Sequence, residues 1–321
     1  MRRRSLLASA LLLPTTLPGI GRAQTSDPGR AIRLIVPTPP GGSSDACARL
    51  LTQALSRVLG QGFVVDNKPG AGGALAAQAL MAAAPDGQTL MWTLASMSGL
   101  PVLQKASPYQ ALTDLSPVSL VGSFTYAMFV HPGVPGRSVA EFVDHARAHP
   151  GQISYATGSL GDYMATTRFL KATGVNSVRV PYRGGSQLMP DLAAGRVQLN
   201  FGPLSSGLPL VREGKLRLLA VLQPQRSALA PDTPTLAEAG VQGVSLPTWQ
   251  ALFGPPRMPA AQALRVSRAV AQVLTEPELR GQLEQQALAV EGSTPQLLAA
   301  AAEQGGQLWR SFVAEHEIAP E

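Results

Sequence analysis

Three turns of the chain combine glycine with hydroxyl side chains, and each follows an apolar run that is typical of a β-strand. The turns are residues 37–45, 95–99 and 157–162. In the first turn, Gly41 and Gly42 come directly before a helical pattern that Ser43, Ser44 or Asp45 can cap. Such a turn presents unpaired N–H groups at the positive end of a helix, and it therefore offers a site for a carboxylate or another anion.

The other two turns extend this interpretation. Thr157-Gly158-Ser159-Leu160-Gly161-Asp162 opens a second helix, and Ala95-Ser96-Met97-Ser98-Gly99 adds hydroxyls at the end of a third strand. Ligands of open α/β sheets collect at the carboxyl ends of strands, where such loops converge. On the residues of the first turn alone, a rigid connection with a well-capped helix is an equally good alternative.

The chain lacks the motifs of several catalytic and nucleotide sites. No Lys-Ser or Lys-Thr pair follows a glycine turn, residues 69–74 match the dinucleotide fingerprint only weakly, and Gly-x-Ser-x-Gly does not occur. Glu141, His145 and His149 are spaced by four on one helical face, so a metal site is conceivable, but a solvated polar stripe is the better interpretation. We expect no cofactor, no metal and no catalytic constellation.

The first 23 residues have the pattern of an export signal. Arg2-Arg3-Arg4 precedes an apolar run at residues 6–13, and the site near Ala23 suits a signal peptidase; the pattern fits the Sec or the twin-arginine route. Removing this segment takes away four arginines and leaves 22 basic against 20 acidic residues, so the net charge falls from +6 to near +2. This balance gives no electrostatic reason to expect nucleic acid as a partner. No second apolar run reaches membrane-spanning length, and we expect the mature, exported protein to be soluble.

Short strand patterns alternate with longer helical patterns in two series. We expect strands at residues 32–36, 63–65, 89–94, 126–130, 153–155, 178–180, 197–201, 217–222 and 288–290. We expect helices at residues 46–59, 74–84, 138–148, 162–173, 187–194, 208–213, 260–274, 277–286 and 294–316. The repeated β-α-β order predicts mainly parallel sheets with helices on both faces. The single cysteine, Cys47, lies in an apolar helical pattern and is expected to be a buried, inert thiol.

The two series predict an α/β protein of two open domains. Residues 24–124 are expected to form the first part of lobe 1, and residues 125–224 are expected to form lobe 2. Residues 225–321 begin with a proline-rich crossing segment and are expected to return to lobe 1 with the C-terminal helices.

Six motifs, in order, resemble the signatures of the Bug family, the extracytoplasmic solute receptors of tripartite tricarboxylate transporters. They are residues 37–45, 66–73 (DNKPGAGG), 85–90 (PDGQTL), 181–185 (PYRGG), 214–217 (GKLR) and 231–235 (PDTPT) with Glu238 and Gly240. The resemblance covers nearly the whole mature chain. It implies a monomeric, type II-like periplasmic binding protein whose two lobes close on a small carboxylate. It also implies delivery of that solute to membrane permease subunits, and no catalytic activity.

The resemblance also implies a site. In that family the ligand lies between the first βα loop and its counterpart in the second lobe, and ordered water helps to hold it. Carried onto this chain, the ligand contacts are Gly41, Gly42, Ser43, Asp45, Ser96, Thr157, Gly158, Ser159, Gly161 and Tyr182.

The chain departs from the family pattern at two places. No histidine follows the second loop, where Asp162 leads into Tyr163-Met164, and no acid occurs at residues 202–205. Asp162 could repel a second carboxylate or bind an amino group, so dicarboxylates, aromatic acids and amino acids all stay open as ligands. Two other functions also stay open: an exported sensor or scavenging receptor without a dedicated transporter, and an exported α/β enzyme.

Overall fold

The computed structural model describes residues 30–320, so the predicted export signal lies outside the described residues. The strands are β1 (Ile32–Val36), β2 (Phe63–Asn67), β3 (Thr89–Leu94), β4 (Ser116–Phe124), β5 (Tyr126–Val130), β6 (Ser154–Thr157), β7 (Val178–Pro181), β8 (Leu199–Pro203), β9 (Arg217–Val221), β10 (Trp249–Gly254) and β11 (Leu288–Val290). The α-helices are α1 (Ser43–Leu59), α2 (Ala74–Met81), α3 (Leu100–Leu103), α4 (Val139–Ala148), α5 (Leu160–Thr173), α6 (Gly185–Ala193), α7 (Leu204–Arg212), α8 (Ala260–Val273), α9 (Pro277–Gln285) and α10 (Pro295–Glu315). Three short 3₁₀ turns are η1 (Ala71–Gly73), η2 (Ala95–Gly99) and η3 (Leu112–Asp114).

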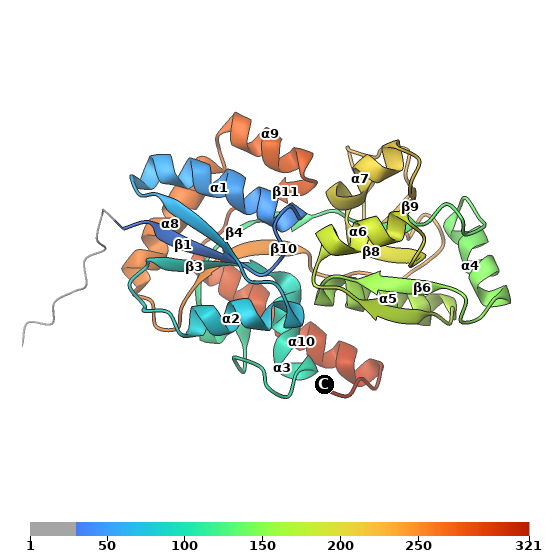
Figure 1. Ribbon diagram of the computed structural model, residues 1–321. Helices are drawn as coiled ribbons and strands as arrows, with labels where there is room; N and C mark the ends of the chain where they lie inside the picture. Colours follow the sequence, from blue (N-terminus) through green and yellow to red (C-terminus); the bar gives the residue numbers. More distant parts are fainter. Residues whose placement is uncertain (1–29, 321) are drawn as a thin grey trace, which may run out of the picture.

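These elements form two α/β lobes that lie side by side (Figure 1). The sheet of the first lobe has the strand order β11-β4-β10-β3-β1-β2, and the sheet of the second lobe has the order β7-β6-β8-β5-β9. Helices α1, α8 and α9 pack together on the first lobe, while α4 to α7 surround the second sheet (Figure 1). The two-lobed α/β fold is therefore confirmed.

Both sheets are mixed, so the prediction of mainly parallel sheets is wrong. Strand β1 is parallel to β2 and β3, but β10 is antiparallel to β3 and β4, and β11 is antiparallel to β4. In the second sheet β6 is parallel to β7 and β8, whereas β5 is antiparallel to β8 and β9. Antiparallel neighbours need no crossover helix between them. The β-α-β order of the sequence therefore does not determine the direction of the strands next to the crossings, which are β4, β5, β9 and β10.

The chain crosses between the lobes at two neighbouring places. Strand β4 ends at Phe124 in the first sheet, and β5 begins at Tyr126 in the second. The return path leaves β9 at Val221 and re-enters the first sheet at β10. Gln223 joins the two crossings, since its Nε2 donates to the Phe124 carbonyl at 2.8 Å and its Oε1 accepts from the Tyr126 N–H at 3.0 Å. The division of the chain at residues 124 and 224 stays a prediction.

The strands β4 and β10, which adjoin these crossings, were not expected from the sequence. Strand β4 contains Ser, Pro and Gly, and β10 lies inside the proline-rich segment at 224–259. They pair with each other over most of their length, from Trp249 opposite Ser123 to Gly254 opposite Ser116. This pairing joins segments more than 120 residues apart, so a local pattern gives little signal for it.

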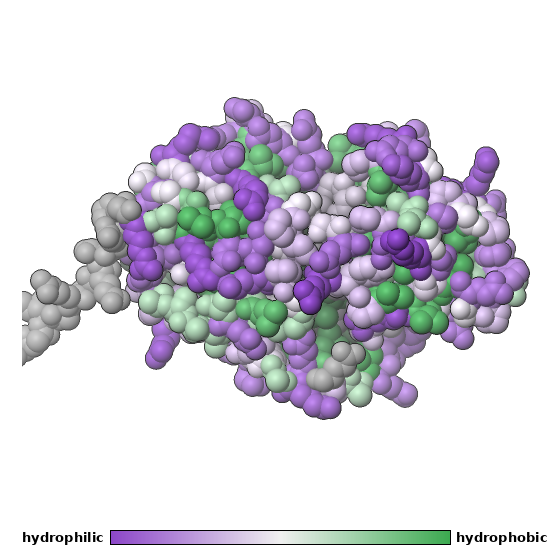
Figure 2. All heavy atoms as spheres, viewed as in Figure 1, coloured by the Kyte–Doolittle hydropathy of each residue, from purple (hydrophilic) through white to green (hydrophobic). Residues whose placement is uncertain are grey.

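The C-terminal helix α10 packs closely on the first lobe and also reaches the second. Trp309 is 1% exposed, and a Cβ atom added to Gly99 would lie only 2.4 Å from its ring. At the far end of α10, the Phe312 ring contacts Tyr163 of α5 edge-on, with the centroids 6.2 Å apart. None of the helices in the described part of the chain is both long and apolar enough to cross a membrane. Hydrophobic residues on the face shown in Figure 2 form separate small patches among hydrophilic ones.

Candidate ligand site between the two lobes

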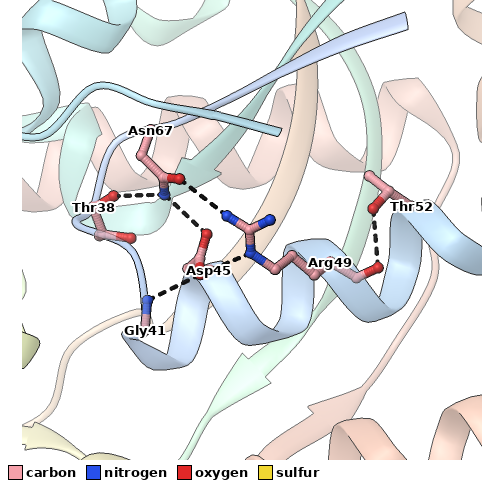
Figure 3. A network of polar contacts seen from close by, with 6 residues as sticks. All are labelled: Thr38, Gly41, Asp45, Arg49, Thr52 and Asn67. Atoms are coloured by element: carbon pink, nitrogen blue, oxygen red, sulfur yellow. Dashed lines mark hydrogen bonds and ion pairs between the residues drawn. The ribbon is translucent and has the colours of Figure 1, made fainter. Parts of the chain in front are cut away.

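A network of polar contacts fixes the turn between β1 and α1 (Figure 3). Asn67 Nδ2 donates to the Thr38 carbonyl at 3.0 Å and to Asp45 Oδ1 at 2.9 Å. Asp45 Oδ2 accepts from the Gly41 N–H and from Arg49 Nε, both at 3.0 Å. Gly41 has a φ of +80°, a backbone conformation that glycine adopts without strain. The network holds the turn in one conformation from both of its ends.

The electrostatics of Asp45 fit this structural role. Burial alone would raise the pKa of its carboxyl group, but hydrogen bonds from Arg49, Gly41 and Asn67 together hold that pKa below its usual value. Asp45 is therefore ionised at neutral pH and committed to the turn.

The first helix begins three residues earlier than its apolar pattern, at Ser43. Gly42 is the N-cap and has no side chain, so the first-turn N–H groups of α1 lack a side-chain cap. Ser43 and Ser44 are buried, and Ser44 Oγ donates to Gln250 Oε1 of β10 at 3.2 Å. The positive end of α1 thus points its N–H groups into the space between the lobes.

The second glycine turn is different, because a carboxylate of its own helix already occupies it. Asp162 Oδ2 accepts from the Gly158 N–H at 2.8 Å, and Oδ1 accepts from Ser159 Oγ at 2.6 Å and from Tyr126 Oη at 3.3 Å. Ser159 Oγ in turn accepts from the Asp162 N–H at 3.2 Å and so caps the start of α5. Burial raises the pKa of Asp162 to about 6, although these hydrogen bonds oppose the rise.

The two lobes touch across the cleft. Ser43 Oγ lies 2.8 Å from Ser205 Oγ and 2.9 Å from Ser206 Oγ, both on α7 of the second lobe. A Cβ atom added to Gly184 would lie 2.4 Å from Pro39 Cδ of the opposite lobe. The lobes are therefore closed, and the first turn contacts the second lobe directly.

A cavity of about 60 Å³ lies between the lobes at this contact. Its walls come from the first turn (Thr38, Pro39, Gly42, Ser43, Ser44), from the crossings (Phe124, Tyr126, Gln250), from Leu94, and from the second lobe (Gly158, Ser159, Asp162, Gly184, Gly185, Leu188, Met189, Asn200, Gly202, Pro203, Ser206). None of the described residues that line this cavity is Lys, Arg or His. We call it the inner cavity.

A second, larger cavity of about 220 Å³ adjoins the inner one and shares Thr38, Leu94, Gly158 and Ser159 with it. The loop at residues 70–73 lines it from the first lobe, and Arg179, Tyr182 and Arg183 line it from the second. Arg179 lies over the Tyr163 ring at 4.2 Å and donates from Nε to Thr157 Oγ1 at 3.2 Å. We call this space the outer cavity, and unlike the inner one it is bordered by cations.

The structure places the ten predicted site residues in three groups. Gly42, Ser43, Gly158 and Ser159 line the inner cavity; Thr157 and Tyr182 line the outer cavity, which Gly158 and Ser159 also reach. Gly41, Asp45, Ser96 and Gly161 line neither. Gly41 and Asp45 belong to the network of the first turn, and a Cβ atom on Gly161 would lie 3.0 Å from Tyr126 Oη. Contact with a ligand stays a prediction for all ten.

Several residues of the site were missed from the sequence. Asn200 is a polar residue inside a predicted buried strand, and that contrast was the available signal for it; Gln250 lies in β10, which the sequence did not predict. Gly184 belongs to a quoted motif but was given no role. Ser205 and Ser206 reach Ser43 only because the lobes meet, so no local pattern marks them.

The alternative metal site at Glu141, His145 and His149 is not assembled. Glu141 Oε2 accepts from the Arg137 N–H at 2.6 Å and so belongs to the cap of α4. His149 Nδ1 lies 2.9 Å from the His145 carbonyl, and the two rings pack with their centroids 4.4 Å apart. Within residues 30–320, no group of three or more His, Cys, Asp or Glu side chains is placed to hold a metal ion.

Comparison with known proteins places this geometry in a family. The model of the tripartite tricarboxylate transporter family receptor matches residues 47–315. Protein BugT of Bordetella pertussis is 33% identical over 286 residues, which cover 86% of this chain and 85% of BugT. Among solved structures, an R. palustris protein with adipate has a TM-score of 0.87 at 30% identity and covers 91% of this chain and 99% of its own. MatC from Rhodopseudomonas palustris with bound malate has a TM-score of 0.81 at 26% identity, with 88% and 99% covered. The chain belongs to the tripartite tricarboxylate transporter receptors, the periplasmic solute-binding family that includes the Bug proteins.

Proposed function

We propose that this chain captures a small carboxylate in the cleft between its lobes and delivers it to the membrane permease subunits of a tripartite tricarboxylate-type transporter. One observation carries the proposal: the uncapped N-terminus of α1 opens into a cavity that both lobes enclose. N–H groups at a helix N-terminus bind a carboxylate through hydrogen bonds and the helix dipole, and need no basic side chain. The adipate and malate bound to two relatives are carboxylates of this kind.

We assign the ligand contacts by the cavity that each predicted residue lines. Gly42 and Ser43 offer first-turn donors from the first lobe, and Gly158 and Ser159 lie opposite them. Thr157 and Tyr182 border the outer cavity and would meet a longer ligand. Gly41 and Asp45 act by holding the turn, and Gly161 leaves room for the Tyr126 hydroxyl; Ser96 stays a predicted ligand contact.

The remaining parts of the proposal concern the life of the protein in the cell. The N-terminal segment directs export by the Sec or the twin-arginine route, with cleavage near Ala23. The mature chain acts as a monomer without catalytic activity, and closure of the lobes gives the permease a surface that the open form lacks.

A thermal-shift screen of the chain from Gln24 tests this function. The probes are acetate, malate, succinate, adipate, benzoate and a set of amino acids, each compared with its neutral amide. A ligand at a hundred times its Kd adds about 2.7 kcal/mol to the free energy of unfolding, which is a clear shift. Shifts with carboxylates and none with amides are expected. A well-folded chain whose unfolding temperature is raised by none of the carboxylates would contradict the proposal.

A further inference from the structure

The second-lobe wall of the inner cavity carries two buried hydrogen-bond acceptors. One is the Asp162 carboxylate, which is 5% exposed. The other is Oδ1 of Asn200, a residue that is 1% exposed and lines the same cavity. Asn200 Nδ2 donates to the carbonyls of Ala156 and Phe201, at 3.0 and 3.2 Å, which fixes the amide with its oxygen on the other side.

The oxygen of Asn200 has no hydrogen-bond donor in the described chain. It points toward Gly202, where a Cβ atom would lie 2.9 Å from it, and Gly202 also lines the inner cavity. Burying an acceptor without a donor costs the full desolvation free energy of that group. We therefore infer that the ligand supplies the donor for Asn200 Oδ1.

The first-lobe wall has the opposite character. It offers the uncapped N–H groups of α1 and the Ser43 hydroxyl, and it carries no acidic side chain. The first-lobe side of the cavity therefore offers hydrogen-bond donors to a negative group. The second-lobe side offers two acceptors to a positive group, the Asp162 carboxylate and Asn200 Oδ1. No Lys, Arg or His among the described lining residues neutralises Asp162.

We propose that the solute is a small α-amino acid whose carboxylate lies at the N-terminus of α1 and whose ammonium group faces Asp162 and Asn200 Oδ1. This inference rests on the proposed function and narrows its ligand class. An ammonium group donates three hydrogen bonds and cancels the charge of Asp162, which a second carboxylate would oppose.

The remaining walls and the size of the cavity favour a short, uncharged side chain. Leu94, Phe124, Leu188 and Met189 supply apolar surface. The inner cavity has about 60 Å³ in this closed form, well below the roughly 150 Å³ of a protein cavity that holds benzene. Alanine and 2-aminobutyrate are therefore suitable probes.

The test compares each amino acid with the acid that lacks only its amino group. Isothermal titration of the chain from Gln24 measures alanine against propionate, and 2-aminobutyrate against butyrate, at about pH 7.5. A charge-assisted hydrogen bond from the ammonium group predicts that each amino acid binds at least about tenfold more tightly than its partner. Equal or tighter binding of propionate and butyrate would overturn the inference and leave the carboxylate receptor standing. Binding of neither class, nor of malate or adipate, would overturn both.

Two further measurements assign the preference to Asp162. In Asp162→Asn the tenfold preference should disappear while propionate binds at least as well as before. The matched control is Glu141→Gln, which removes the acid of a similar Ser-capped helix start on α4, far from the cavity. It should keep the full preference. An Asp162→Asn variant that keeps the preference would overturn the inference.

The pH dependence of the preference for alanine over propionate tests the role of Asp162 without a mutation. Tyr126 is the one other titratable residue that lines the inner cavity in the described chain, and burial and Asp162 both raise its pKa well above the usual value. A change between about pH 7.5 and about pH 5.5 therefore reports Asp162. The preference for alanine over propionate should shrink as the pH falls. A preference that stays constant or grows would contradict the proposal.

Discussion

Replacement of Asp162 by asparagine tests the electrostatics of the second turn, with a magnitude that follows from its burial. The pKa of Asp162 rises from its ordinary 3.8 to about 6 in the folded chain. The native state therefore holds the proton more tightly than the unfolded state between about pH 4 and pH 6, and stability falls as the pH rises through this window. Each pKa unit corresponds to about 1.36 kcal/mol, so the buried carboxylate costs roughly 3 kcal/mol at neutral pH relative to its protonated form.

Asparagine keeps the shape of Asp162 and cannot ionise. Urea unfolding of wild type and Asp162→Asn, at intervals between about pH 4 and pH 7.5, measures the difference between their free energies of unfolding. All other titrating groups are common to both chains and cancel. The difference should move in favour of the variant by roughly 2.5 kcal/mol between these pH values, since the unfolded carboxyl is already partly ionised at about pH 4. A difference that is flat with pH, or that moves in favour of wild type, would refute this account of Asp162.

Three other substitutions or modifications test separate parts of the structure. Ser43→Ala removes the contacts to Ser205 and Ser206 across the cleft and should weaken carboxylate binding by about 1–2 kcal/mol, roughly tenfold in Kd by isothermal titration; an unchanged Kd would deny these contacts a role in closure. Burial raises the pKa of the Cys47 thiol to about 12, so iodoacetamide should alkylate Cys47 only in denaturant. Mass spectrometry detects the label, and rapid alkylation of the native chain would show that the thiol is not buried. Trp309→Ala should lower the free energy of unfolding by about 3–5 kcal/mol in urea titrations, because α10 packs through this ring; a loss under 1 kcal/mol would contradict that packing.

The sequence predicted the middle of most helices well and their first turns poorly. Helix α1 was expected from Ala46 and begins at Ser43, and α7 was expected from Leu208 and begins at Leu204. In α1 the missing turn consists of Ser43, Ser44 and Asp45, whose buried polar side chains bond to α7, to β10 and to the first turn respectively and so carry no apolar periodicity. The residues at the cleft are thus the ones that the hydrophobic pattern describes least.

The strands that cross between the lobes were missed for a related reason. In β4 the run Ser116-Pro117-Val118-Ser119 lacks a continuous apolar pattern, and its partner β10 is more than 120 residues away. The pairing is determined by tertiary contacts and not by local propensity. Strands β1, β3 and β5 consist mostly of apolar residues, and they were predicted to the residue.

The candidate site was predictable in its loops and not in its charges. The glycine turns correctly indicated which loops line the cleft. From the sequence alone, however, the N-termini of both α1 and α5 were expected to be available to an anion. The structure fills the start of α5 with Asp162 and leaves the start of α1 uncapped. That distinction depends on which side chain turns back onto its own loop, and the spacing of residues does not fix it.

Carboxylate binding should require the lobes to close, and the contact between Gly184 and Pro39 allows this to be tested. Gly184 has extended backbone, with φ 165°, which accepts any residue, but a Cβ atom there would lie 2.4 Å from Pro39 Cδ, far inside the roughly 3.5 Å of carbon contact. Gly184→Ala therefore holds the lobes apart without straining its own loop. Gly281→Ala is the control, since a Cβ atom there meets nothing within 4 Å.

The measurement is isothermal titration of both variants with the carboxylate that stabilises wild type most. Gly184→Ala is expected to lose at least about tenfold in affinity, while Gly281→Ala should bind as wild type does. Wild-type affinity in Gly184→Ala would contradict the claim that the closed cleft is the binding site.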